Sequence, residues 1–357
     1  MYNYTVYLYL LSMILCRYMK LIKTADAAGT VLCHDLTEII PGKSKGTRFR
    51  KGHIIQAEDI PVLLNMGKEH LFVWEKQQDM QSMSDMQSMS GFLHEEEGAE
   101  KLSLLCRGAH LKPAPVREGK IELFAEIPGL LKIDSAKIIA LNSIGGIAVI
   151  TRRGNTGVKE GDRIAALKII PLLIEEEKLH RAAEILAGEK PIDIVPYRRK
   201  KAALVITGNE VFNKRIPDTG SEMVRKKIET FPAECVEKVI LPDDHELITS
   251  TILGLLEKGI DLVICTGGMS VDPDDKTPLA IKNSGARIVS YGIPFNPGTM
   301  LLLSYYEKDG RSVPVIGAPA CVFYEHTTAL DILLPRLMAD DPISREDLAL
   351  LGEGGLS

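Results

Sequence analysis

Residues that could bind a phosphate group or a metal ion are concentrated between positions 266 and 277, which read T-G-G-M-S-V-D-P-D-D-K-T. Gly267 and Gly268 permit positive φ angles and carry no Cβ, so backbone N–H groups there can approach an anionic ligand closely. Asp272 and Asp275 could hold a divalent cation, because Mg²⁺ typically uses one or two carboxylates together with substrate phosphate oxygens. A single aspartate could instead act as a general acid or base. This composition is typical of a ligand-binding loop.

The same segment also has a purely structural interpretation. A Gly-Gly pair after a strand often forms only a tight turn. Asp275 or Thr277 could serve as the N-cap of the helical pattern that begins at Leu279. The other loops of the chain bear on this choice.

Two further apolar runs end in loops of similar composition. One loop reads Thr207-Gly208-Asn209-Glu210 and continues to Asp218, and the other reads Gly317-Ala318-Pro319-Ala320. If the strands before the three loops are parallel, all three loops lie at one edge of a sheet, where the ligands of such sheets bind. Asp218 could alternatively cap the helix that follows it.

The elements that would position these loops alternate between strand and helix. This alternation predicts an α/β domain at 202–340 with a mostly parallel sheet and helices on both faces. We expect strands at Ala202–Ile206, Val236–Leu241, Asp261–Cys265, Arg287–Ser290, Met300–Ser304 and Val313–Ile316, and helices at Ser221–Phe231, Asp243–Lys258, Leu279–Asn283 and Phe323–Met338.

The rest of the chain divides by composition. We predict an upstream extension at 1–18, a small β-rich module at 19–75, a Met/Gln/Ser repeat linker at 76–92, a mixed α+β platform at 93–190, a basic linker at 191–201 and a C-terminal tail at 341–357. Within the platform, Ile138–Asn142 and Arg163–Leu173 have the composition of strands. The apolar run Val6–Leu15 is too short to span a bilayer, although a membrane-associated segment is an alternative interpretation.

Composition excludes several classes of protein. The chain has 357 residues, of which 45% are hydrophobic and 25% charged, as in ordinary globular proteins. A net charge of −5 argues against non-specific binding to nucleic acid. The six cysteines show no zinc-ligand spacing and no disulfide framework. The basic run Arg198–Lys201 is more typical of a solvated linker than of a phosphate patch.

Several segments resemble a known family. T-G-G-M-S-V-D-P-D-D-K-T-P is similar to the signature of the molybdopterin-binding domain, and I-T-G-N-E-V and G-A-P-A resemble the first and third loops of that domain. Upstream, V-R-E-G-K-I-E-L and A-L-K-I-I-P-L resemble the molybdopterin molybdotransferase family. The resemblance implies a three-layer α/β/α domain at 202–340.

The resemblance also implies roles for individual residues. Asp275 takes the acidic position of the family and Asp218 the acid of the first loop, while Asp272 and Asp275 would hold Mg²⁺. The residues implied to contact molybdopterin are Thr207, Gly208, Asn209, Glu210, Thr266, Gly267, Gly268, Ser270, Thr277, Gly317 and Pro319.

The activity implied is the transfer of molybdate or a nucleotidyl group to or from molybdopterin, or its adenylated form, by a cytoplasmic homodimer. This sequence departs from the transferase pattern: Asp272-Pro273 replaces a glycine and an acid, the segment Asn296–Met300 lacks the usual lysines, and Ala320-Cys321 replaces Gly-Asn. Two alternatives therefore stay open. One is a non-catalytic carrier that delivers the cofactor to a recipient molybdoenzyme, and the other is a hydrolase of a phosphorylated nucleotide.

Overall fold

A computed structural model of the chain describes residues 20–40, 42–74, 91–270 and 276–356. The predicted extension at 1–18, most of the Met/Gln/Ser repeat, and Asp272 and Asp275 lie outside these residues. The chain divides into two compact units. The first comprises 1–124, 133–152 and 163–193, and the second comprises 125–132, 153–162 and 194–357. No helix in the described part of the chain is long and apolar enough to cross a membrane.

The first unit begins with short strands, as the sequence predicted. β1 (Lys20–Lys23), β5 (His70–Trp74) and β2 (Val31–Leu32) form an antiparallel sheet, while β3 (Leu36–Ile40) and β4 (Ser44–Phe49) form a hairpin. The helical segments are η1 (Thr24–Asp26) and α2 (Asp59–Asn65). Leu32, Ile55 and Leu63 are fully buried at the centre of this region.

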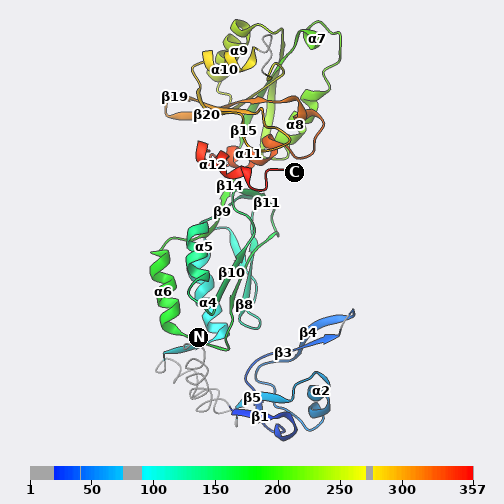
Figure 1. Cartoon of the computed structure of the whole chain (residues 1–357), viewed down its shortest axis with the longest axis vertical. Coiled ribbons are helices and arrows are strands. Elements are labelled where there is room, and N and C mark those ends of the chain that lie inside the picture. The colour runs from blue at the N-terminus through cyan, green and yellow to red at the C-terminus, as the bar shows by residue number, and fades with distance from the viewer. Residues whose placement is uncertain (1–19, 41, 75–90, 271–275, 357) are drawn as a thin grey trace. The chain divides into compact units, whose positions relative to one another are not determined.

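The rest of the first unit mixes helices with antiparallel strands (Figure 1). A sheet of order β10-β12-β8-β7 accompanies the two-stranded sheet β13-β6. These strands are β6 (Phe92–His94), β7 (Leu111–Pro113), β8 (Lys120–Ala125), β10 (Ile147–Thr151), β12 (Arg163–Ile169) and β13 (Leu173–Glu175), and the helices are α4 (Glu95–Cys106), α5 (Ser135–Asn142) and α6 (Glu176–Leu186).

Two expectations for this region were wrong. The strand expected at Ile138–Asn142 is the helix α5, because Asp134 caps it by accepting a hydrogen bond from the Lys137 backbone N–H at 3.0 Å. The single strand expected over Arg163–Leu173 is interrupted between β12 and β13. The interruption contains Pro171, which has no N–H to donate to a ladder.

The predicted linker at 191–201 was also wrong. Two strands pass through it, β14 (Ile192–Pro196) and the start of β15 (Lys200–Thr207). Ile192 and Ile194 alternate with more exposed residues and are almost fully buried, so this segment is part of the folded structure. β14 lies in a small sheet of order β11-β9-β14 with β11 (Thr156–Val158) and β9 (Gly129–Ile133).

The second unit is built on a six-stranded sheet of order β16-β15-β17-β20-β19-β18. β16, β15, β17 and β20 are parallel, and β19 and β18 continue the sheet antiparallel. The additional strands are β16 (Ala233–Leu241), β17 (Leu262–Thr266), β18 (Arg287–Tyr291), β19 (Leu302–Lys308) and β20 (Arg311–Ala318). The mostly parallel sheet predicted from the sequence is confirmed.

Alternate residues of β15 face two different cores. Leu204 and Ile206 pack in one core with α8 (Gly220–Glu229) and α11 (Ala329–Met338). Val205 packs in the other core with α9 (His245–Glu257) and α10 (Thr277–Asn283), which lie next to each other in Figure 1. Because a strand directs successive side chains to opposite faces, the sheet is covered on both sides and the domain has three layers, α/β/α.

The C-terminal part of this unit differs from the expected pattern. A helix beginning at Phe323 was predicted, but residues Ala320–Phe323 form the short η2 and α11 begins at Ala329. Thr328 and Asp331 form a capping box that fixes this start. The predicted tail contains α12 (Arg345–Ala349) and η3 (Leu350–Gly352), while α7 (Asn209–Phe212) follows β15.

The buried strand β17 provides a test of the packing. We expect Ile264→Ala to lower the free energy of unfolding by about 2–5 kcal/mol, because Ile264 is fully buried and its truncation leaves a cavity. Val236→Ala is the matched control, since Val236 lies in β16 and is 43% exposed, and we expect it to cost less than about 1 kcal/mol. Urea unfolding measures both. Equal losses would contradict the core assignment.

Candidate functional site

The three loops predicted to share an edge do so. Val205 pairs with Cys265 and Ile206 with Thr266, and Thr266 in turn pairs with Ala318. The carboxyl ends of β15, β17 and β20 therefore lie side by side, and each continues directly into one of the loops. This arrangement follows from the parallel pairing and confirms the expected edge.

Hydroxyl groups join the first two loops. Thr277 Oγ1 donates to the Gly267 carbonyl at 2.8 Å. The Thr207 hydroxyl lies 3.0 Å from Thr277 Oγ1 and 3.3 Å from the Thr266 carbonyl oxygen, and it donates its single proton to one of these two acceptors. Thr207 and Thr277 are both buried. These two hydroxyls, which the sequence suggested as ligand contacts, are used between the loops.

Glycine is required where the loops touch. Gly267 has a φ of +92°, and a Cβ there would lie 2.0 Å from the Thr207 carbonyl oxygen. Gly268 has a φ of +53°, with Thr277 Oγ1 3.2 Å from the position of a Cβ. In the first loop, a Cβ on Gly208 would meet Glu210 Oε1 at 2.8 Å. Gly267 thus allows the main chain of the second loop to pass against that of the first, whereas the Gly208 contact lies within the first loop.

The third loop is connected to the second through Met269. A Cβ on Gly317 would lie 2.4 Å from Met269 Cε, so the buried methionine side chain rests on this glycine. Tyr291, at the end of β18, adds a further contact: its hydroxyl lies 3.0 Å from the Met269 carbonyl oxygen and 3.2 Å from that of Ser270. Tyr291 was not predicted, and its position at the end of an apolar strand was the only signal in the sequence.

A fourth segment lies at the same edge. β18 runs parallel to β20, because both are antiparallel to β19, and its carboxyl end leads to Asn296–Met300. The Pro297 carbonyl accepts a hydrogen bond from the Ala329 N–H at 3.0 Å. A Cβ on Gly298 would lie 2.6 Å from Ala329 Cβ. This segment therefore packs against the start of α11.

Comparison with known families is consistent with this geometry. Residues 203–339 match the model described as "Probable molybdopterin binding domain". Residues 203–339 belong to the molybdopterin-binding domain family. Residues 21–75 match a domain of unknown function, DUF8806. A search of the curated proteins gave no match.

Solved structures with some likeness to this chain include three from microorganisms. The tungsten cofactor synthesizing protein MoaB of Pyrococcus furiosus is 14% identical, with 39% of this chain and 88% of that one covered and a TM-score of 0.29. The CinA protein of Thermoplasma acidophilum is 18% identical, covering 34% and 89%, with a TM-score of 0.28. A molybdenum cofactor biosynthesis protein of Corynebacterium diphtheriae, described as putative, is 13% identical, covering 43% and 99%, with a TM-score of 0.31. Scores this low carry no argument about function.

The acids of the molybdopterin-binding domain are only partly described. Asp218 accepts hydrogen bonds from the backbone N–H of Ser221 at 3.0 Å and from its hydroxyl, and it pairs with Lys238 at 3.0 Å. Asp218 therefore caps the first turn of α8, the structural alternative considered from the sequence. Asn209 is held by Asp243, whose carboxylate accepts the Asn209 N–H at 3.0 Å.

The pKa of Asp218 reflects this environment. Burial opposes ionisation of the carboxyl group, but the hydrogen bonds from Ser221 and the charge of Lys238 outweigh burial and lower the pKa below its usual value. Asp218 is therefore ionised at neutral pH. Cys265, in the neighbouring strand, is a contrast: burial raises the pKa of its thiol to about 12 and makes it unreactive.

Two features of the described loops fit a bound anion. The hydroxyl Oγ1 of Thr266 is fully buried and has no hydrogen-bond partner, the only such side chain among the described residues of the second unit. An unpaired buried hydroxyl costs about 1–3 kcal/mol, so a ligand that reorganises the loop could recover this energy. In addition, Gly267 and Gly268 have no side chains to shield their backbone N–H groups from a ligand.

Among the described residues, no group of three His, Cys, Asp or Glu is arranged to hold a metal ion.

The contact between Gly267 and Thr207 can be tested by substitution. We expect Gly267→Ala to lower the free energy of unfolding by more than about 3 kcal/mol, because the new methyl group would overlap the Thr207 carbonyl. Gly259→Ala is the matched control: Gly259 has a φ of +80° but open space around its Cβ position, so only the backbone conformation costs energy, about 1 kcal/mol. Similar losses in urea unfolding of both variants would show that the loops do not touch.

The cap on α8 predicts a dependence of stability on pH. A carboxyl group whose folded pKa is lowered stabilises the protein above its unfolded pKa, and this stabilisation disappears as the pH falls through the folded pKa. We expect Asp218→Asn to lower the free energy of unfolding by about 0.5–2 kcal/mol at pH 7, with the difference from wild type shrinking below about pH 4. Lys238→Met should reduce this pH dependence. A difference that is unchanged from pH 6 to pH 3 would contradict the assignment.

Proposed function

We propose that this protein binds molybdopterin, or its adenylated form, at the carboxyl edge of the second unit's sheet, and that it transfers molybdate or a nucleotidyl group to or from this ligand with Mg²⁺. The observation that carries the proposal is the interlocked pair of loops at Thr207 and Gly267 within a domain of the molybdopterin-binding family. The loops bring uncovered main chain to the place where ligands of parallel sheets bind.

The described residues would act by positioning the main chain. Thr207 and Thr277 tie the first loop to the second, and Tyr291 holds the carbonyl side of the second loop, so the N–H groups of Gly267 and Gly268 are fixed relative to the sheet. Backbone N–H groups of such a loop can donate to a phosphate without a charged side chain. Mg²⁺, when bound, would neutralise phosphate charge; its proposed ligands Asp272 and Asp275, and the proposed acid/base role of Asp275, rest on the sequence alone.

The distribution of cations favours a second candidate, a non-catalytic carrier. Lys227 pairs with Asp331 at 2.7 Å and Lys238 pairs with Asp218 at 3.0 Å. The segment Asn296–Met300 contains no lysine or arginine. Since an anion such as molybdate requires positive charge or hydrogen-bond donors near it, these positions supply less than a transferase would need. A carrier would bind the cofactor and deliver it to a recipient molybdoenzyme.

Calorimetric titration separates these functions. Purified protein is titrated with molybdopterin and with adenylated molybdopterin, each with and without Mg²⁺ and molybdate. For the transferase we expect tight binding of the adenylated form and release of AMP when molybdate is added. Binding without AMP release would assign the carrier function. Failure of both pterins to bind would overturn the proposal and leave hydrolysis of a phosphorylated nucleotide to be assayed.

The same assay tests the acid predicted from the sequence. We expect Asp275→Ala to abolish AMP release while its thermal unfolding stays unchanged, because the proposed role of Asp275 is electrostatic. Asp274→Ala is the matched control, since it removes a neighbouring carboxylate to which the sequence assigns no role. Full activity of the Asp275→Ala variant would show that another residue supplies this function.

The proposed homodimer and cytoplasmic location rest on family resemblance. Sedimentation tests the proposed homodimer.

A further inference from the structure

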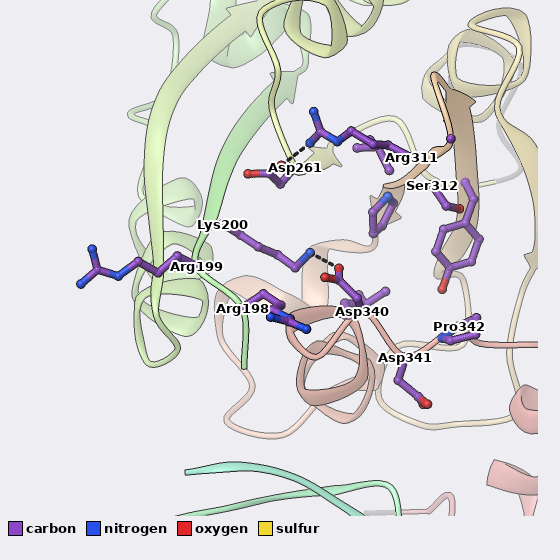
Figure 2. A pocket seen from close by; sticks show the side chains of 14 residues that line it. Arg198, Arg199, Lys200, Asp261, Arg311, Ser312, Asp340, Asp341 and Pro342 are labelled. Atoms are coloured by element: carbon purple, nitrogen blue, oxygen red, sulfur yellow. Dashed lines mark hydrogen bonds and ion pairs between the residues drawn. The ribbon is translucent and has the colours of Figure 1, made fainter. Parts of the chain in front are cut away.

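A polar pocket lies at the edge of the six-stranded sheet opposite the glycine loops, where the parallel strands begin (Figure 2). Its volume is about 390 Å³. The lining comes from the start of β15 and the two residues before it, the start of β20 and the turn before it, β19, the residue before β17, and the end of α11 with the turn that follows it. These lining residues are Arg198, Arg199, Lys200, Asp261, Tyr305, Gly310, Arg311, Ser312, Val313, Pro314, Leu337, Asp340, Asp341 and Pro342. β15 alone spans eight residues, about 26 Å at 3.3 Å per residue, so this pocket is separate from the glycine loops.

The carboxylates of the pocket are already paired. Asp261 forms an ion pair with Arg311, and Asp340 with Lys200 (Figure 2). The third carboxylate, Asp341, is neutralised by Lys132 at 2.9 Å and by Arg336. With all three acids compensated, the two remaining cations give the lining an excess of positive charge.

Lys200 shows that the basic run is not a solvated linker. Only 8% of Lys200 is exposed, and burial of an ammonium group is costly unless it is paired. The ammonium group of Lys200 has three N–H donors, and Asp340 accepts a hydrogen bond from one of them. The interpretation of this run as a solvated linker is therefore wrong at Lys200, and the alternative interpretation, a phosphate patch, stays open.

Arg198 and Arg199 are the two lining cations that form no ion pair with a described residue. Of the two, Arg198 lies near the ion pair of Lys200 with Asp340 (Figure 2). Arg198 is exposed. Its backbone N–H donates to the Met338 carbonyl at 2.8 Å, which holds the residue beside the end of α11. The same bond satisfies one of the last carbonyls of the helix, a group that would otherwise repel an anion. In Figure 2, Arg198 lies near Lys200 and Asp340, whereas the side chain of Arg199 points away from the other residues.

We propose that this pocket binds the phosphate group of a small phosphate monoester. The Arg198 guanidinium can make two parallel hydrogen bonds to phosphate oxygens, with Lys200 and Arg311 close by as further donors. A phosphate monoester carries a charge of about −1.5 to −2 at neutral pH, which matches the positive excess. Val313, Pro314 and Leu337 provide apolar surface for the organic part, and the volume lies within the range of about 300–1,000 Å³ of small-molecule sites.

Calorimetric titration of the full chain tests the proposal. The ligands are ribose 5-phosphate and inorganic phosphate, each at constant ionic strength. We expect wild type to bind and Arg198→Ala to bind at least about tenfold more weakly, because a charge-assisted hydrogen-bond pair is lost. Arg199→Ala, the matched control, removes the same charge one residue away and should change the affinity by less than about threefold. Tighter binding of the ester than of inorganic phosphate supports a monoester site; equal binding supports recognition of the phosphate group alone.

Three results would overturn the proposal. They are no binding of either phosphate compound to wild type, equal losses for Arg198→Ala and Arg199→Ala, and loss of molybdopterin binding in the Arg198→Ala variant. The last result would show that the two edges do not form separate sites. Because molybdopterin is titrated independently, failure of the phosphate site would leave the function proposed for the carboxyl edge untouched. Arg198 is exposed, so its truncation should leave thermal unfolding unchanged.

Discussion

The passage of the Gly267 main chain against the Thr207 carbonyl is the contact on which the carboxyl edge depends. Neighbouring strands of a sheet lie only about 4.8 Å apart, so a loop that turns at the end of β17 must cross the end of β15 at close range. A Cβ at Gly267 would be 2.0 Å from the Thr207 oxygen. Glycine is therefore required by the fold at the same position where it would expose main chain to a ligand. The tight-turn interpretation of the Gly-Gly pair is confirmed, and the ligand-loop interpretation stays a prediction.

Most polar side chains of this edge are occupied within the protein. Thr207 and Thr277 join two loops, Asp218 caps α8, and the Tyr291 hydroxyl contacts main-chain carbonyls. Among the described residues, what these contacts leave for a ligand is mainly backbone N–H groups and the buried Thr266 hydroxyl. In the proposed function, recognition of the anion thus depends on the positions of the loops more than on charged side chains. Binding of molybdopterin at such a site would therefore depend less on the missing lysines than the transfer of molybdate would.

Charged groups are arranged differently at the two edges of the sheet. The interior between them is apolar on both faces of β15, and it cannot hold uncompensated charge. Charged groups therefore gather where the strands begin and end. At the amino edge they form ion pairs between residues far apart in the chain, such as Lys200 with Asp340, 140 positions away. Once these pairs form, Arg198 and Arg199 are the pocket cations left without a carboxylate among the described residues.

The sequence by itself determined the α/β class, the mostly parallel sheet and the sharing of one edge by three loops. It did so because these features follow from local rules: alternation of strand and helix, glycine at turns, and the common direction of parallel strands. Local signals failed where a distant contact or a cap decided the outcome. The helix α5 replaced an expected strand because of Asp134, and the supposed linker became β14 because Ile192 and Ile194 are buried. Only the tertiary structure decided that Thr207 and Thr277 bond to each other, that Tyr291 joins the edge, and that Arg198 and Lys200 line a pocket. These facts depend on contacts between residues that only folding brings together.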